Sequence, residues 1–127
     1  MRAVLVALAV VGLTACGGGG GGGSVTSPPP KVNTPPPANG ITVSNNSFSP
    51  ANKSVAVGTT VQWAWNTCTG DSYSGQQCVE HSVTFDDGLT SPTQDQGTYS
   101  RTFNAAGTYN YHCAIHGAAM AGSITVQ

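Results

Sequence analysis

The second half of the chain alternates apolar and polar residues with the period of two that is typical of β-strands. The alternation is clearest at Val61, Trp63 and Trp65, which would share one face of a strand. Other runs of the same kind occur at residues 41–43, 54–57, 81–85, 99–103, 108–113 and 123–127. Stretches rich in Gly, Asn and Asp separate several of them. About seven short strands with turns at this spacing predict an all-β sandwich.

The predicted strands all lie in residues 40–127, which are enough for one domain with a single core. Aromatic side chains can supply most of that core: Phe48, Trp63, Trp65, Phe85, Phe103, Tyr109 and Tyr111. Arg101 does not fit the pattern, because it has the same parity as Tyr99 and Phe103. We expect its charged group to reach the rim of the sandwich or to lie past a twist in the strand.

Charged residues make up only 7% of the chain, whereas soluble domains usually carry about 25%. Four Lys and Arg stand against five Asp and Glu, for a net charge of −1. This balance excludes a non-specific nucleic-acid binder, which needs a basic surface against phosphate groups.

The first sixteen residues have the features of an export signal. A short positive start precedes an apolar run at residues 3–13, which is too short to span a membrane. Residues 13–16, Leu-Thr-Ala-Cys, resemble the lipobox of bacterial lipoproteins, in which the Cys is lipidated and becomes the first residue. We therefore expect a signal peptide over 1–15 and lipid on Cys16, with the protein anchored to a membrane and facing the periplasm or the exterior. The alternative is a soluble secreted protein with a free Cys16.

Residues 16–39 have the composition of a tether. Residues 17–23 are all Gly, which predicts a flexible coil, and Pro triplets at 28–30 and 35–37 favour extended polyproline II. Such a segment could hold the domain on the order of 50 Å from the membrane. As a spacer, it could be removed without loss of stability in the domain; a proline motif bound by another module is the alternative.

Four cysteines are present, and they suggest different roles. Cys68 and Cys78 flank nine polar, loop-like residues, so we expect a disulfide worth roughly 2–3 kcal/mol on the loop-entropy model. Cys113 would then be unpaired in an oxidising compartment. It is either a small buried hydrophobe or a residue with chemistry of its own.

The surroundings of Cys113 favour chemistry. Cys113 ends a predicted strand, His116 and Met120 follow within one loop, and His81 begins another strand. A thiolate, two imidazoles and a thioether form the ligand set of a type 1 copper site, with the Met as a long axial ligand. Structural zinc prefers a closed tetrahedron of Cys and His. The sequence therefore predicts one copper ion per chain.

His112 needs separate treatment, because neighbouring residues of a strand point to opposite faces. It would therefore not share a metal with Cys113. Either it is an ordinary surface histidine, or it is a port for electrons or partner docking that is bonded directly to a ligand residue.

Residues 40–127 resemble the cupredoxins, specifically the plastocyanin and pseudoazurin branch. The most specific match is the pattern G-x-Y-x-Y-x-C-x-x-H-x-x-x-M-x-G at residues 107–122, together with His81 before a predicted strand. The resemblance implies an eight-stranded Greek-key sandwich that carries single electrons between redox proteins. The type 1 copper would be held by His81, Cys113, His116 and axial Met120, in a protein that we expect to be a monomer and not an enzyme.

Some features depart from that family. Plastocyanins usually carry an Asn after the first His ligand, which bonds across to the ligand loop. Ser82 and Ala114 occupy those places here, so we expect a weaker or absent cross-link. The short span from His81 to Cys113 implies trimmed loops or a missing edge strand, and the loop between Cys68 and Cys78 looks like an insertion.

Other classes of function remain open from the sequence. The domain could store or deliver copper rather than carry electrons. It could also be a metal-free binding module, although both Trp precede Cys68, unlike the order in immunoglobulin-like domains. An enzyme with Cys113 as nucleophile and His116 as base is possible on residue types alone.

Overall fold

The computed structural model describes residues 29–71 and 73–127 of the chain. The predicted signal peptide, the lipidation site at Cys16 and the glycine run lie outside the described residues. Within the described residues, no helix has the length and apolar character needed to cross a membrane.

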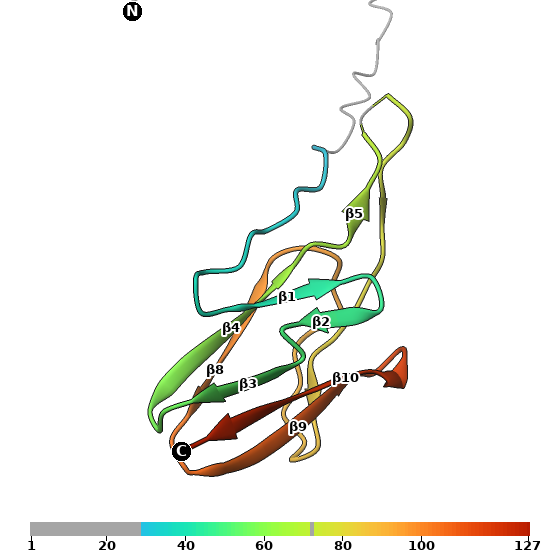
Figure 1. The fold of residues 1–127 in the computed structure, drawn as a ribbon. Helices are drawn as coiled ribbons and strands as arrows, with labels where there is room; N and C mark the ends of the chain where they lie inside the picture. Colours follow the sequence, from blue (N-terminus) through green and yellow to red (C-terminus); the bar gives the residue numbers. More distant parts are fainter. Residues whose placement is uncertain (1–28, 72) are drawn as a thin grey trace, which may run out of the picture.

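Strands are the regular elements of the described chain, and they form a sandwich of two sheets (Figure 1). Their bounds are β1 Ile41–Ser44, β2 Ser47–Ser49, β3 Asn52–Val55, β4 Thr59–Trp65, β5 Cys68–Thr69, β6 Gln77–Cys78, β7 Thr84–Phe85, β8 Thr98–Phe103, β9 Gly107–Cys113 and β10 Gly117–Val126. One four-stranded sheet has the order β2-β1-β4-β8 and the other β3-β10-β9-β7, while β5 and β6 form a separate ladder. The predicted all-β sandwich is confirmed.

In the first sheet, β4 lies between a parallel neighbour, β1, and an antiparallel one, β8. The alternating residues Val61, Trp63 and Trp65 of β4 are almost completely buried, as the pattern predicted. Ala64, which lies on the opposite face of the strand, is also buried, so the end of β4 is buried on both faces. This end of β4 leads directly into the β5–β6 ladder.

In the second sheet, the β9–β10 hairpin is the central feature, with β3 parallel to β10 on one side. The pairing of β9 with β10 shifts register between Gly117 and Ala121, which makes room for a bulged segment just after the turn. The edge strand β7 is only two residues long, so the expected shortening between His81 and Cys113 takes the form of a short edge strand rather than a missing one.

Aromatic rings fill the space between the sheets. The ring of Trp63 meets those of Phe85 and Tyr111 edge to face, with centroids 5.6 and 5.4 Å apart. Phe103 packs against Phe85 in the same cluster. The aromatic residues predicted for the core therefore supply it, with Tyr109 packed against its margin.

Arg101 does not extend into solvent at the rim. Its guanidinium lies over the ring of Phe85, 4.2 Å from the centroid, and its side chain is only 11% exposed. The rings of Phe103 and Tyr109 flank it, each 5.0 Å away, and the carboxylate of Asp87 pairs with it. The polar outlier of the pattern is thus accommodated by cation–π contacts and an ion pair.

Candidate metal centre

Three side chains converge where the β9–β10 hairpin meets the segment before β7. Cys113 is the last residue of β9, and His116 lies in the turn that leads into β10. His81 comes from outside this hairpin and forms an isolated antiparallel bridge with Gln94. One ligand atom from each of the three residues lies within 4.8 Å of the others. The fold thus brings together three of the four residues predicted to bind metal.

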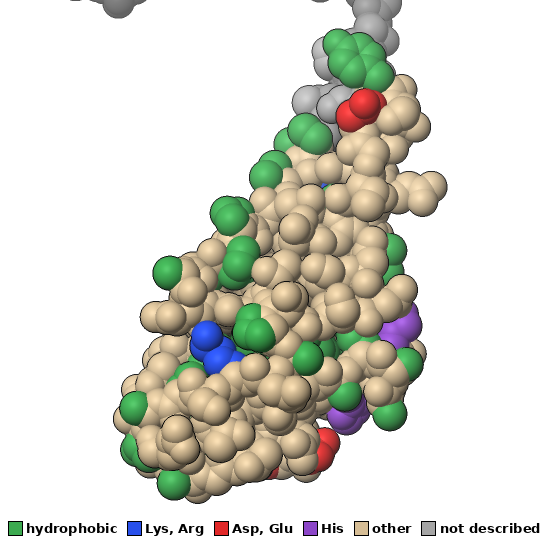
Figure 2. All heavy atoms as spheres, in the orientation of Figure 1, with side chains coloured by type: hydrophobic (Ala, Val, Ile, Leu, Met, Phe, Trp, Pro, Cys, Tyr) green, Lys and Arg blue, Asp and Glu red, His purple; other side chains and the backbone are tan. Residues whose placement is uncertain are grey.

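Two of the three side chains are buried inside the protein, and the imidazole ring of His116 connects the cluster to the surface. His81 and Cys113 are fully buried, whereas His116 is half-buried. The two imidazole rings lie 4.9 Å apart at an angle of 36°. Figure 2 shows histidine side chains at the surface along one edge of the molecule, with few charged side chains on the visible face.

Two ring nitrogens of the cluster lack protein partners among the described residues. His81 Nε2 and His116 Nδ1 are buried and accept or donate no hydrogen bond within the described residues, and His81 Nδ1 lies 3.7 Å from Cys113 Sγ. Buried polar atoms without partners are rare and call for an explanation such as an ion. Burial, reinforced by the nearby His116, lowers the pKa of His81 and so favours the neutral imidazole that binds metals. The donor set fits copper, because a thiolate with two imidazoles suits a soft to borderline ion.

The sulfur of Cys113 has one polar neighbour in the backbone. The amide of Ser82 donates to Cys113 Sγ at 3.5 Å, within the range for hydrogen bonds to sulfur. Cys113 is a free thiol, since the predicted disulfide joins Cys68 to Cys78. The disulfide prediction is confirmed, and Cys113 is left available as a ligand.

The cross-link between His81's segment and the ligand loop is present, contrary to the expectation of a weak or absent one. The amide of Ala114 donates to the hydroxyl of Ser82 at 2.9 Å. The short side chain of Ser82 can make this cross-link, where an Asn is expected in plastocyanins, because Ser82 is almost completely buried and lies directly against the loop. The hydroxyl also meets that of Thr84 at 3.1 Å.

Met120 lies in the bulged part of β10, between Gly117 and Ala121. It is 1% exposed and belongs to the same buried cluster as Cys113. The local pattern explains this, because Met120 is the large apolar residue among small ones in a segment that must turn one side chain inward. Its position is compatible with the axial role that the sequence predicts.

His112 points away from the cluster, as the strand alternation predicted. It pairs with Thr84 across the sheet, is 37% exposed, and its Nδ1 lies 3.7 Å from Asp86 Oδ1. A shallow groove of about 440 Å³ opens beside it, lined by Asp86, Asn110, Tyr111, His112, Gly117, Ala118, Ala121 and Gly122. His112 is therefore outside the donor cluster and at the surface.

Two residues that hold His81 were not anticipated from the sequence. Gln94 exchanges two backbone hydrogen bonds with His81, at 2.9 and 3.0 Å. The indole of Trp65 donates to the carbonyl of His81 at 3.1 Å. No motif marks Gln94, because it acts through its backbone, whereas Trp65 carried only the signal of a core residue.

Comparison with known proteins agrees with this geometry. The family of copper-binding proteins described as the plastocyanin/azurin family matches residues 38–127. The chain belongs to this family. It is 32% identical over 87 residues to a plastocyanin of Scenedesmus fuscus, covering 63% of this chain and 86% of that protein.

Solved cupredoxin structures are also similar to the chain. An oxidized variant of amicyanin superposes with a TM-score of 0.57 at 28% identity, covering 71% of this chain and 82% of the other. A purple cupredoxin from Nitrosopumilus maritimus gives a TM-score of 0.56 at 24% identity, covering 69% and 98%, and this match supports the fold alone. The protein is thus a cupredoxin whose cofactor is copper, and cupredoxins such as plastocyanin and amicyanin are electron carriers rather than enzymes.

Proposed function

We propose that this cupredoxin is an exported type 1 copper protein that carries single electrons between redox proteins, with copper held by His81, Cys113, His116 and axial Met120. The observation that carries the proposal is the cluster of one buried thiol and two imidazoles, in which one buried nitrogen of each ring has no partner among the described residues. Bound copper would supply the one-electron couple between Cu(II) and Cu(I).

The protein's part is to hold the ligands in nearly one geometry in both oxidation states. Cys113 is fixed as the last residue of β9, and its sulfur accepts a hydrogen bond from the amide of Ser82. His81 is held through its backbone by Gln94 and Trp65. Ligands fixed by the surrounding structure move little on electron transfer, so the reorganisation that accompanies each transfer is small.

His116 offers the route to the surface, because it is the half-buried ligand. Its neighbours Ile115, Ala118 and Ala119 are exposed and uncharged. Such a surface lets a redox partner approach the ligand ring closely. With so few charges on the chain, the association with a partner should depend only modestly on salt.

The cellular position follows from the amino-terminal segment, which we propose to be a signal peptide over 1–15 followed by a lipidated Cys16 and a tether. The lipid would place the domain outside the cytoplasm and close to a membrane. Metabolic labelling with a radioactive fatty acid tests this: label incorporated by the wild-type chain and lost in Cys16→Ala supports the anchor. Equal labelling of both chains, or of neither, contradicts it.

The metal site is tested by adding one equivalent of Cu(II) to the full-length protein and recording visible and EPR spectra. An intense thiolate-to-copper band with narrow copper hyperfine splitting is expected for a type 1 site. Cys113→Ser should abolish that band, whereas His112→Ala, which alters the neighbouring residue outside the cluster, should retain it. A band that survives in Cys113→Ser would exclude the proposed site.

The same sample separates electron transfer from copper delivery. A carrier should cycle reversibly at an electrode and keep Cu(I) in the presence of a Cu(I) chelator. Ready loss of Cu(I) to the chelator would favour storage or delivery instead. An ordinary tetragonal Cu(II) spectrum, or no binding at all, would favour a metal-free binding module.

A further inference from the structure

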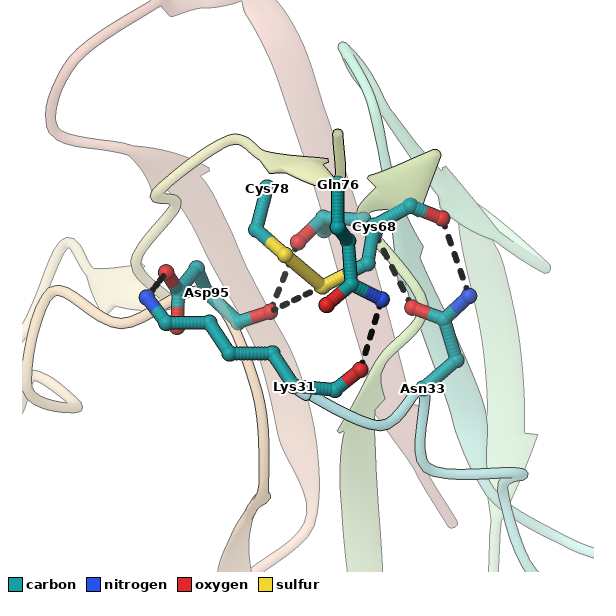
Figure 3. Close-up of polar contacts among 7 residues, drawn as sticks. Lys31, Asn33, Cys68, Gln76, Cys78 and Asp95 are labelled. Atoms are coloured by element: carbon teal, nitrogen blue, oxygen red, sulfur yellow. Dashed lines mark hydrogen bonds and ion pairs between the residues drawn. A yellow bond between two sulfur atoms is a disulfide. The ribbon is translucent and has the colours of Figure 1, made fainter. Parts of the chain in front are cut away.

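Residues 31–34, which we call the strap, lie against the end of the domain that carries the disulfide, although the sequence placed them in the tether (Figure 3). The side-chain amide of Asn33 bonds both backbone groups of Cys68, donating to its carbonyl at 3.0 Å and accepting from its amide at 2.9 Å. The carbonyl of Lys31 accepts a bond from Gln76 Nε2 at 2.7 Å, in the loop between β5 and β6. The strap is thus bonded to β5 and to the loop of the disulfide hairpin.

One chain of contacts leads from the strap to His81 through Trp65. The amide of Thr34 donates to the carbonyl of Trp65 at 2.9 Å. Trp65 is completely buried, and its indole nitrogen donates to the carbonyl of His81 at 3.1 Å. A residue of the strap and a predicted copper ligand are therefore separated by a single residue, which bonds the strap through its backbone and His81 through its side chain.

A second chain of contacts reaches His81 through the segment before β8. The ammonium group of Lys31 pairs with the carboxylate of Asp95, whose side chain is 13% exposed. The carbonyl of Asp95 also accepts a hydrogen bond from the hydroxyl of Thr67 at 2.8 Å, so Asp95 is held through both its side chain and its backbone. Its neighbour Gln94 makes both backbone bonds to His81.

His81 depends on these contacts more than the other ligands do. Cys113 lies in the long β9–β10 ladder, and His116 lies in the turn of the same hairpin. His81 lies in no strand, and its only ladder partner among the described residues is the single bridge to Gln94. Its carbonyl accepts two hydrogen bonds, one from Gln94 and one from Trp65. The strap bonds Trp65 itself and pairs with Asp95, the neighbour of Gln94.

We propose that Lys31, Asn33 and Thr34 are positioning residues for His81, so that the segment joining the domain to its amino-terminal side is part of the support of the copper site. The inference rests on the proposed role of His81 as a ligand. In physical terms, the strap restricts the opening of the Trp65 and Gln94 contacts, and these in turn keep the imidazole of His81 within the donor cluster.

The test uses the full-length chain without metal, in which Lys31→Ala and Asn33→Ala are combined. Hydrogen exchange followed by NMR reports on the indole proton of Trp65 and the amide protons of His81 and Gln94. We expect these three protons to exchange about tenfold faster in the variant, the factor that corresponds to the net contribution of about one hydrogen bond. The amides of the β4–β8 ladder should keep their wild-type rates.

Two matched variants separate positioning from general stabilisation. Val32→Ala changes a strap residue that is 70% exposed, and it should leave all rates unchanged. Thr60→Ala removes the exposed bond between Thr60 and Thr102 across β4 and β8, and it should not single out the three protons near His81. Unchanged exchange in the double variant, or equal acceleration throughout the sheets, would overturn the inference.

Copper loading gives a second, independent readout. Release of Cu(II) to a chelator should be several-fold faster from the double variant than from the wild-type or Val32→Ala chain. Faster proton exchange with unchanged copper release would overturn the inference, because the strap would then support the backbone but not the ligand. A wild-type chain that binds no copper would instead overturn the proposed function. In that case the exchange rates alone would show whether the strap stabilises the backbone contacts of His81.

Discussion

The hydroxyl of Ser82 accepts a hydrogen bond from the amide of Ala114, 2.9 Å away, and so joins two segments 32 residues apart. Ser82 follows His81 in the sequence, and Ala114 follows Cys113. The bond therefore fixes the distance between the part of the chain that carries one predicted ligand and the loop that carries the others. The amide of the same serine points at Cys113 Sγ.

Removing this hydroxyl should destabilise the domain. In Ser82→Ala the amide of Ala114 loses its partner in a part-buried position, which should lower the free energy of unfolding by about 1–3 kcal/mol. Urea unfolding of the metal-free protein measures the change. Thr84→Val is the control: it removes the contacts of the Thr84 hydroxyl with Ser82 and Thr90 but keeps the bond to Ala114. It should cost less, because it leaves no backbone amide without a partner. Equal losses in the two variants would contradict the special role of the Ala114 bond.

Replacement of Met120 tests the axial ligand. Met120→Leu keeps the volume of a residue that is 1% exposed, so it should cost less than about 1.5 kcal/mol of stability. The reduction potential of the copper protein should rise, because loss of a weak sulfur donor destabilises Cu(II) more than Cu(I). Voltammetry measures the shift. Ile124→Leu, at a fully buried position further along β10, is the control and should leave the reduction potential unchanged. An unchanged potential in Met120→Leu would mean that Met120 is only a core residue and not an axial ligand.

The pair of Asp87 and Arg101 should make stability depend on acid pH. Bonding to Arg101 lowers the pKa of Asp87 below its usual 3.8, so the carboxylate contributes stability above that pH. The contribution is lost as pH falls below 3.8 and through the lowered pKa. Because Asp87 is 42% exposed, the effect should stay below about 1 kcal/mol.

Thermal unfolding of the metal-free protein between neutral and strongly acid pH checks this dependence. Asp87→Asn should melt lower than wild type at neutral pH, and the difference should shrink as the wild-type carboxyl becomes protonated. Glu80→Gln, at an exposed carboxyl, serves as the control and should show no such convergence. A constant gap between wild type and Asp87→Asn at all pH values would argue against the linkage.

The disulfide of the β5–β6 hairpin should stabilise the domain without shaping the copper spectrum. Combining Cys68→Ser with Cys78→Ser should lower the free energy of unfolding by about 2–3 kcal/mol, the loop-entropy value for a link of this length. Denaturant unfolding of the oxidised wild type and the variant gives the comparison. Cys113 is untouched, so the thiolate-to-copper band should keep its position, and loss of the band would mean that the hairpin shapes the site directly.

The parts of the fold that could be predicted from sequence are those whose signal is local. The alternation at Val61, Trp63 and Trp65 reflects a strand with one buried face, and the structure buries all three. The spacing of Cys113 and His116 places both on one hairpin, so their proximity followed from a single loop. Residue chemistry then narrowed the metal to copper.

The remaining features arise from contacts between segments far apart in sequence. Lys31 and Asp95 are 64 residues apart, and nothing in a stretch of Pro, Val and Asn indicates that it lies against a domain. Arg101 looked out of place because parity reports only which face a side chain leaves from. The three rings and the carboxylate that contact its guanidinium are brought to that face by the fold as a whole.

Asn33 holds both backbone groups of Cys68, and Cys68 is covalently joined to Cys78. A mechanical pull that arrives along the chain from the amino-terminal side therefore meets a cross-linked hairpin before it meets β1. Load enters at the margin of the sandwich, where a covalent bond closes the loop. In a chain anchored through the tether that we propose, the load would reach the disulfide hairpin and the carbonyl of Trp65 at the end of β4 before the middle of either sheet.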